Sequence, residues 1–243
     1  MKRAVDDLAD ALRRDGFAFV RGTEMRRFIK AHGALADWEP FVASWDDLGL
    51  DTYMADGGRY RKRRHAIYAV DAATAEIRRA PHQPHYQSRD YNPLHGGIQR
   101  WFEPVVPAIG AGPSMTAILA TCRDLFERLS PVRSWHIELH QFRIEARAGE
   151  AGRPTPEGMH RDGVDYVLVL LIRRRNVRSG ETSIRAPDGR TLGSFTLSEP
   201  MDAALVDDLR VMHGVTPVEA IDRSEPAFRD VLVVTFRHRD AGN

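Results

Sequence analysis

The chain has 243 residues, of which 42% are hydrophobic and 28% charged, an ordinary balance for one large globular domain. Its 35 basic and 34 acidic residues give a formal charge of +1, which excludes the strongly basic surface of a nucleic-acid binder. The single cysteine, Cys122, excludes an internal disulfide and a multi-cysteine zinc site. No stretch approaches the roughly 18 apolar residues of a membrane-spanning helix, and the N-terminus lacks the apolar run of a secretory signal. We therefore expect a cytoplasmic protein with neither a membrane nor a nucleic acid as partner.

Residues before 131 mix helical and extended patterns. Apolar residues recur at helical spacing until Gly16, and a short apolar run follows it. The expected elements, in chain order, are a helix ending at Gly16, a strand at 17–20, a helix at 24–35, a strand at 60–70 and an amphipathic helix at 114–129 that buries Cys122.

From residue 131 onward the pattern changes to short strands separated by turn residues. The candidate strands are 134–146, 166–172, 182–184, 193–197, 204–215 and 230–236. Six or more short strands at this spacing predict a sandwich or jelly roll. We therefore expect a mainly β fold with flanking helices. Residues 1–243 would form a single domain, with 1–130 as a helical, substrate-side α/β elaboration and 131–243 as most of the jelly-roll core.

The triplet His160-Arg161-Asp162 stands directly before a predicted strand. Side chains two apart on an extended backbone point to one face, so the imidazole and the carboxylate can share a metal. His213, at the end of a later apolar segment, supplies a second imidazole if the strands are neighbours. Two histidines and one carboxylate with open positions are typical of non-haem Fe(II) oxygenases. Taken separately, the triplet is more simply a solvated loop and His213 a core histidine, and only the combination favours a metal.

Four segments in this order carry a resemblance to a known family: GMHRDG at 158–163, SGET at 179–182, MHGVTP at 212–217 and RDVLVVTF at 229–236. They resemble the bacterial 2-oxoglutarate/Fe(II)-dependent dioxygenase family that includes L-isoleucine 4-hydroxylase. The segments DGGRYR at 56–61 and YNPLHGG at 91–97 are similar to its N-terminal half. The resemblance implies a double-stranded β-helix, cupin-like core, free amino acids as the best-known substrates, and His160, Asp162 and His213 as the iron ligands.

The distal carboxylate of 2-oxoglutarate needs a cation, and a bidentate arginine suits that planar group. Such a bond contributes about 1.5–3 kcal/mol. Arg229 opens the last predicted strand and is our choice. Arg223, ten residues after His213, is the rival but precedes a turn. Gln141 is a weaker candidate for contact with the cosubstrate.

Substrate-binding residues are harder to identify. The basic stretch at 59–64 is most simply a solvated face, yet an amino-acid carboxylate needs a cation, so Arg59 or Arg61 is a candidate clamp. Tyr91 and Asn92 are candidate lining residues, by resemblance and loop position.

The remaining histidines do not form a convincing second metal site in the sequence. His82, His85 and His95 occupy a polar loop that lacks a carboxylate at ligand spacing. His136 and His140 share a strand face with Glu138, for which ordinary strand positions are the simpler interpretation.

We therefore expect an oxygenase that uses Fe(II), 2-oxoglutarate and dioxygen to hydroxylate an unactivated C–H bond of a free L-amino acid or close derivative. The same chemistry on a carrier-bound or peptidyl residue, desaturation and epimerisation remain alternatives. So do a cupin-like metal-binding module and a metal-dependent sugar isomerase. Ligating histidines must be neutral, so activity should fall below about pH 6. Zn(II) and Cu(II) should compete with Fe(II) for an N/O site of this kind.

Overall fold

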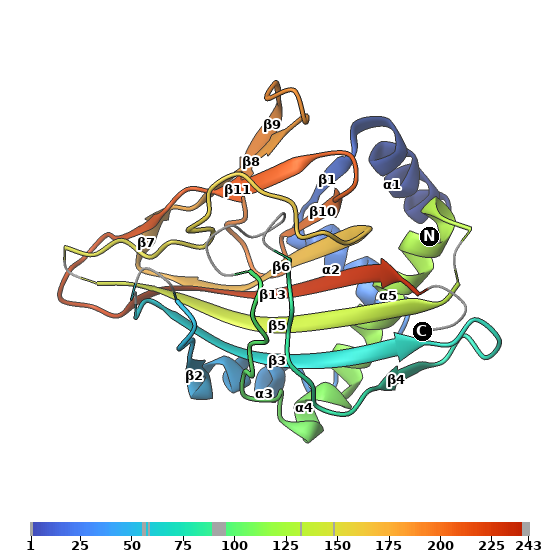
Figure 1. Ribbon diagram of the computed structural model, residues 1–243, viewed down its shortest axis with the longest axis horizontal. Helices are drawn as coiled ribbons and strands as arrows, with labels where there is room; N and C mark the ends of the chain where they lie inside the picture. The colour runs from blue at the N-terminus through green and yellow to red at the C-terminus, as the bar shows by residue number, and fades with distance from the viewer. Residues whose placement is uncertain are drawn as a thin grey trace.

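An antiparallel sheet of eight strands, counted over the described residues, is the largest feature of the computed structural model (Figure 1). The structure describes residues 2–54, 57, 59–88, 96–131, 133–147 and 149–239. Within it, the strand order is β1-β10-β6-β13-β5-β3-β2, with β4 paired to the edge of β3. A three-stranded sheet, β11-β8-β9, and the pair β12-β7 complete the β structure. The jelly-roll prediction is confirmed.

The elements have the following bounds. The helices are α1 (Lys2–Asp15), α2 (Gly22–Lys30), α3 (Trp38–Ala43), the 3₁₀ helix η1 (Ser44–Asp47), α4 (Pro107–Gly110) and α5 (Pro113–Leu129). The strands are β1 (Phe17–Val20), β2 (Gly49–Leu50), β3 (Arg61–Val70), β4 (Ile77–Arg79), β5 (Trp135–Ala146), β6 (Tyr166–Arg175), β7 (Val177–Ser179), β8 (Glu181–Arg185), β9 (Thr191–Thr196), β10 (Ala203–Asp207), β11 (Met212–Val215), β12 (Val218–Ala220) and β13 (Ala227–His238).

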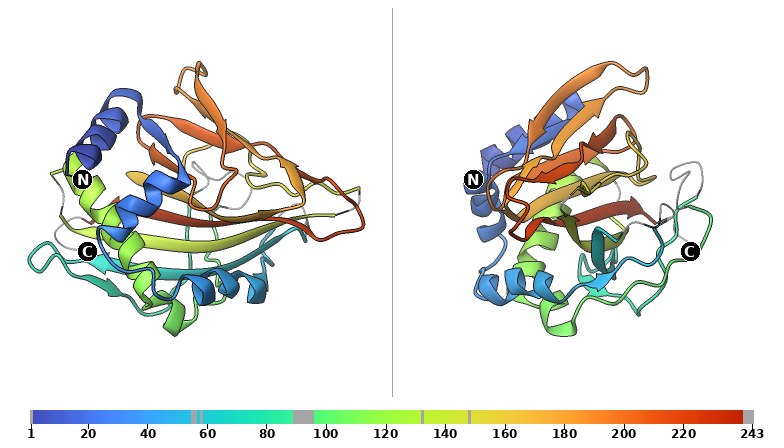
Figure 2. Two further views of the ribbon diagram at one scale, coloured as in Figure 1. Left: turned by 180° about the vertical axis from the view of Figure 1, so that it is seen from behind. Right: turned by 90° about the vertical axis from the view of Figure 1, so that its left-hand side faces the viewer.

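The two faces of the large sheet have different partners. Helices cover one face, and the small sheet and long loops lie over the other (Figure 2). Along β5, Ile137 and Leu139 belong to the apolar core beneath the helices, whereas His140 and Phe142 line a cavity on the opposite face. This alternation follows from the two-residue period of a strand. The register of the central strands therefore decides which side chains meet in the cavity.

One of the expected strands is divided in the structure, and the helix expected at 24–35 ends at Lys30. The segment 204–215 is not one strand but two, β10 and β11, separated by a turn that carries the buried Asp208. Residues before 131 supply β1, β2, β3 and β4 to the large sheet. The first helix ends as expected at Gly16, whose φ of 78° suits a residue without a Cβ atom.

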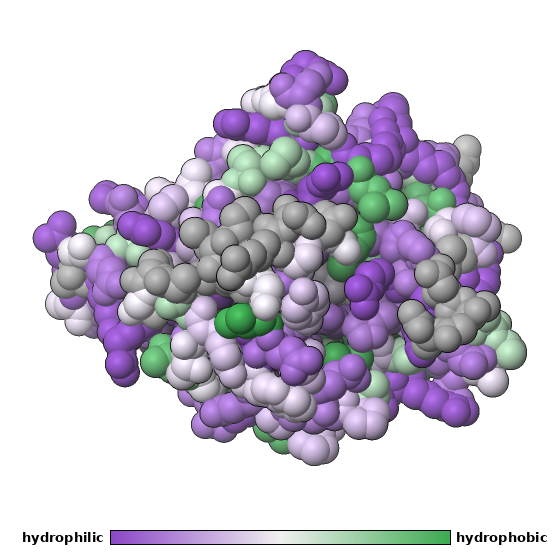
Figure 3. All heavy atoms as spheres, in the orientation of Figure 1, coloured by the Kyte–Doolittle hydropathy of each residue, from purple (hydrophilic) through white to green (hydrophobic). Residues whose placement is uncertain are grey.

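No helix in the described part of the chain has the length and apolar character needed to cross a membrane. The face shown in Figure 3 is largely hydrophilic, with its apolar side chains in small separate groups. The predicted metal ligands and Arg229 lie instead in a cavity inside the fold.

Candidate metal centre and cosubstrate site

A cavity of about 320 Å³ lies between the large sheet and the loop that precedes β6. One wall is formed by side chains of β3, β5 and β13, and the other by residues 154–164 together with His213 on β11. Its volume lies at the lower end of the range for small-molecule sites, about 300–1,000 Å³. Both the predicted metal ligands and the predicted cosubstrate anchor line this cavity.

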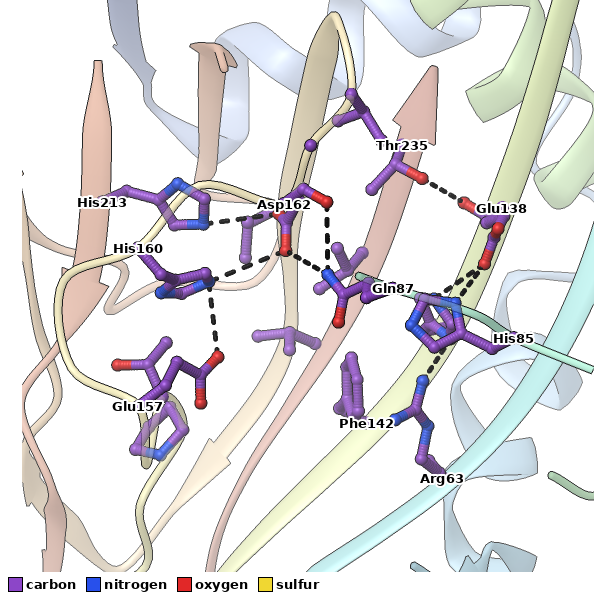
Figure 4. Close-up of a pocket in the computed structure, with 18 of the residues that line it drawn as sticks. Arg63, His85, Gln87, Glu138, Phe142, Glu157, His160, Asp162, His213 and Thr235 are labelled. Carbon is purple, nitrogen blue, oxygen red and sulfur yellow. Dashed lines mark hydrogen bonds and ion pairs between the residues drawn. The ribbon is translucent and has the colours of Figure 1, made fainter. Parts of the chain in front are cut away.

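His160, Asp162 and His213 come together on one side of the cavity (Figure 4). Their ligand atoms all lie within 4.8 Å of one another. The Nε2 atom of His160 is 3.6 Å from Oδ1 of Asp162, and Nε2 of His213 is 3.5 Å from its Oδ2. The two histidines are neighbours because their backbones form a β-bridge, with N–H to O distances of 3.0 and 2.9 Å. This bridge brings together the triplet and the distant histidine.

The hydrogen bonding of His160 prepares it to bind a metal. Its Nδ1 lies 3.0 Å from the carbonyl oxygen of Gly158, which can only accept, so the neutral ring carries its proton on Nδ1. The lone pair of Nε2 then points at Asp162, as a metal ligand requires. The residues present therefore fit a divalent cation held by two imidazoles and a carboxylate.

The pKa values of the three side chains also favour a bound cation. Burial acts to lower the pKa of His160, but its interactions with Asp162 and Glu157 raise it to about 9. Burial lowers the pKa of His213 to about 4, and the charge of His160 adds to this effect. Although burial opposes it, the two imidazoles hold the pKa of the Asp162 carboxyl well below its usual range. A cation bound among them replaces the proton that the group otherwise takes up.

Asp208, in the turn between β10 and β11, holds the loop of the triplet in place. Its carboxylate accepts the backbone N–H groups of Asp162, Gly163 and Val164 at 3.0, 2.8 and 3.2 Å. It is 1% exposed, and burial together with the charge of Asp162 raises its pKa to about 7. Sequence patterns do not identify this residue, because they predict a continuous strand over 204–215 and not a turn at Asp208.

Arg229 lies on β13 and is only 2% exposed. Its Nε and Nη2 atoms are buried and have no hydrogen-bond partner, and it forms no ion pair within the described chain. Burial, with a contribution from Arg174, lowers its pKa to about 10, so the guanidinium stays charged at neutral pH. A buried, unpaired cation is costly unless a ligand anion completes it. Arg229 is therefore suited to the distal carboxylate of 2-oxoglutarate.

Three other residues that the sequence suggested for cosubstrate or substrate binding do not line the cavity. Arg223 is exposed in the turn before β13, outside the cavity. The prediction that Gln141 contacts the cosubstrate is corrected by the structure. Its side chain donates to Ser44 Oγ at 2.8 Å and does not line the cavity, because alternate residues of β5 face the helices and Gln141 is one of these. Arg59 is exposed and does not line the cavity either.

Arg61 does line the cavity, but its guanidinium is committed to Asp51, at 2.8 Å from Nε and 2.7 Å from Nη2. Its burial contradicts a solvated basic face. The candidates Tyr91 and Asn92 lie outside the described residues.

A second group of histidines surrounds Glu138 on the opposite wall (Figure 4). Oε2 of Glu138 lies 3.2 Å from Nε2 of His65 and is hydrogen bonded to Nδ1 of His85. Oε1 of Glu138 lies 3.2 Å from Nε2 of His136, and Nε2 of His140 lies 3.8 Å from Oε2. The sequence places His136, Glu138 and His140 on one strand face, but it does not show that His65 and His85 join them from two separate segments.

The geometry around His140 argues against a metal in this second group, although its ligand atoms lie close enough together. Arg63 Nη2 lies 2.7 Å from His140 Nδ1, and a guanidinium can only donate. The neutral His140 therefore carries its proton on Nε2, the atom directed at Glu138. Burial keeps the pKa of His65 at about 4 and that of His140 well below its usual value. The group is a carboxylate surrounded by neutral imidazoles that can donate to it.

Residues 42–235 match the family model described as 2OG-Fe dioxygenase. A 3(1)-hydroxy-L-isoleucine 4-dioxygenase from Pantoea ananatis (strain AJ13355) is 28% identical over 242 residues, covering 96% of both chains. An L-isoleucine-4-hydroxylase from Bacillus thuringiensis is 26% identical over 198 residues, covering 79% of this chain and 82% of its own.

Among solved structures, a bsmA homolog from Methylobium petroleophilum PM1 superposes with a TM-score of 0.88 at 37% identity, covering 96% of this chain and 93% of that one. The structure of IDO from Bacillus thuringiensis superposes with a TM-score of 0.81 at 19% identity, covering 97% of this chain and all of that one, and supports the fold alone.

Proposed function

Because the chain belongs to the 2OG-Fe dioxygenase family, we propose that it hydroxylates an unactivated C–H bond of a free L-amino acid or a close derivative. The observation that carries the proposal is that three metal-ligand side chains and an unpaired, buried arginine line one cavity. The names of the two curated relatives, which act on isoleucine or its hydroxylated form, support an amino-acid substrate.

Each group in the cavity has a distinct role in this proposal. When bound, Fe(II) with 2-oxoglutarate and dioxygen supplies the oxidation, which converts R–H to R–OH and releases succinate and carbon dioxide. His160, Asp162 and His213 would hold the metal, and Arg229 would hold and orient the distal carboxylate of the cosubstrate. The buried cavity walls exclude water from the reacting groups.

The family match sets aside a non-oxygenase binding module and a sugar isomerase. Hydroxylation of a carrier-bound or peptidyl residue, desaturation and epimerisation use the same cofactors and stay as alternatives. A screen of the free amino acids for Fe(II)- and 2-oxoglutarate-dependent succinate formation tests the proposal. A supporting result is one amino acid that stimulates succinate and yields a product one oxygen heavier. If no free amino acid stimulates succinate or is altered, the proposal is wrong.

The cosubstrate anchor has its own test. Arg229→Ala should raise the apparent KM for 2-oxoglutarate by about 10- to 100-fold, because a charge-assisted bond is lost. Arg223→Ala, an exposed arginine on the same stretch of chain, is the matched control and should leave that KM unchanged. The reverse pattern would show that Arg229 is not the anchor.

A further inference from the structure

The buried charges that line the cavity divide into those that have a partner and those that do not. Arg61 and Arg63 share the carboxylate of Asp51, with closest distances of 2.7 and 3.5 Å. Glu138, with its neutral histidines, supplies the second negative charge on that wall. Two guanidiniums and two carboxylates therefore balance there without a ligand.

Arg100 is a second buried cation, and no described carboxylate forms an ion pair with it, although Asp51, Glu138 and Glu157 act on it from a greater distance. It is 2% exposed, and its backbone is fixed by a β-bridge to His85. Nη2 donates to Oε1 of Gln87 at 3.0 Å, Nε has no partner, and no ion pair joins Arg100 to any described residue. Burial, followed by the charge of Arg61, lowers its pKa. Since Arg229 is assigned to the cosubstrate, Arg100 is the remaining buried guanidinium of the cavity without a direct ion pair to a described residue.

Glu157 is a carboxylate in the same cavity that, like Arg100, has a buried polar atom without a hydrogen-bond partner. Its Oε1 lies 3.5 Å from Nε2 of His160, and its buried Oε2 has no hydrogen-bond partner (Figure 4). The Nε2 atom is the one that His160 offers to a metal, so in the loaded enzyme Glu157 keeps no cationic side chain of its own. No ion pair joins Glu157 to Arg100 among the described residues, although both line the same cavity.

We propose that Arg100 binds the α-carboxylate, and Glu157 the α-ammonium, of a zwitterionic amino-acid substrate. A free α-amino acid carries a carboxylate and an ammonium on the same carbon. One such molecule can therefore form an ion pair with Arg100 and another with Glu157. A peptidyl residue offers neither charge and a carrier-bound thioester lacks the carboxylate, so both would leave Arg100 buried and unpaired. This inference rests on the proposed amino-acid hydroxylation and assigns its substrate contacts.

Gln87 ties this clamp to the metal centre. While its Oε1 accepts from Arg100, its Nε2 lies 3.3 Å from the backbone oxygen of Asp162. Gln87 lies between the two walls in Figure 4. A substrate carboxylate held by Arg100 is therefore placed at a fixed distance from the metal ligands, which is what selects one C–H bond for attack.

The test compares three probes that differ only in their charged groups: L-isoleucine, L-isoleucinamide, which lacks the carboxylate, and 2-hydroxy-3-methylpentanoate, which lacks the ammonium. If the screen finds another amino acid, its amide and 2-hydroxy acid take their place. The kcat/KM for probe-stimulated succinate release is measured in the wild type and in the Glu157→Gln and Arg100→Gln variants. The exposed-residue variants Glu150→Gln and Arg190→Gln serve as controls.

The expected result is a crossed loss of selectivity. Glu157→Gln should reduce the preference for the amino acid over the 2-hydroxy acid by about 10- to 100-fold, the size of one charge-assisted bond. Arg100→Gln should reduce the preference for the acid over the amide by a similar factor. Each variant should leave the other preference within about threefold, and the controls should leave both unchanged.

Three results would overturn the inference or its premise, and they are distinguishable. A wild type that accepts the amino acid, amide and 2-hydroxy acid equally refutes the clamp while hydroxylation stands. A Glu157→Gln variant that loses Fe(II) affinity and substrate-independent succinate release, with its selectivity unchanged, places Glu157 at the metal instead. A wild type that alters no free amino acid refutes the proposed function itself.

Discussion

The two walls of the cavity each carry histidines around a carboxylate, yet they are built for opposite purposes. On one wall, His160 donates Nδ1–H to a carbonyl and directs a lone pair at Asp162. On the other, Arg63 donates to Nδ1 of His140, so that an N–H is directed at Glu138. The first arrangement needs a cation between its groups, and the second is complete without one.

The comparison shows that residue types and distances do not by themselves identify a metal site. Both groups satisfy a purely geometric criterion for ligand atoms. What separates them is the partner of the other ring nitrogen, because it fixes which nitrogen keeps its lone pair. Nearby charge strengthens the distinction, since Arg61 and Arg63 line the cavity on the Glu138 side.

The largest effect is expected from the triad. His160→Ala, Asp162→Ala and His213→Ala should each abolish Fe(II)-dependent succinate release and lose metal affinity. The loss should exceed the about 10- to 100-fold that follows removal of an outer partner of a ligand. Succinate assays and equilibrium metal binding measure it. Normal turnover in any of the three variants would show that the metal binds elsewhere.

A smaller effect is expected at Asp51, whose carboxylate balances the guanidiniums of the Glu138 wall. Asp51→Asn leaves Arg61 and Arg63 buried without their shared anion, which should lower the free energy of unfolding by about 3–5 kcal/mol at pH 7. Asp10→Asn, at an exposed ion pair, is the control and should change it by less than about 0.5 kcal/mol.

The effect of Asp51 should also depend on pH. Burial acts to raise the pKa of its carboxyl, but Arg61 and Arg63 outweigh burial and hold it below the ordinary value. A group whose pKa is lowered by folding stabilises the fold above its unfolded pKa, and that stabilisation is lost as the pH falls through the folded value. The gap between wild type and Asp51→Asn in urea unfolding should therefore be constant from pH 7 to 5 and narrow below about pH 4. A gap that widens on acidification would contradict the assignment.

Sequence alone was enough to predict the jelly roll and to select the residues of the triad. His160 and Asp162 are two apart, so their shared face follows from local backbone geometry, and Arg229 opens a strand with a clear pattern. The proximity of His213 to His160 is harder to predict from the sequence, because the bridge between them depends on how distant strands pack.

The sequence shows only the β5 part of the Glu138 group, His136, Glu138 and His140, and there is a physical reason why it does not show the rest. His65 on β3 faces His140 on β5 only through a pairing of strands about 70 residues apart, which no local pattern encodes. The rule that apolar residues point inward also misleads here, because the interior of this jelly roll is a polar ligand cavity. Two of the four basic residues of β3, Arg61 and Arg63, face this cavity and are therefore buried.

The smallest expected change concerns Glu138, and it decides between the two interpretations of its wall. Glu138→Gln keeps an acceptor oxygen for His65 and His85 but removes the charge, so we expect a loss of only about 1–2 kcal/mol in the free energy of unfolding. The wild type should bind one equivalent of Fe(II) or Co(II) per chain under anaerobic titration, and Glu138→Gln should bind the same amount. Asp162→Ala, which removes a carboxylate of the other wall, should bind none. Two equivalents in the wild type that fall to one in Glu138→Gln would mean that a cation displaces the proton on His140 despite Arg63, and that hydrogen bonding does not separate the two walls.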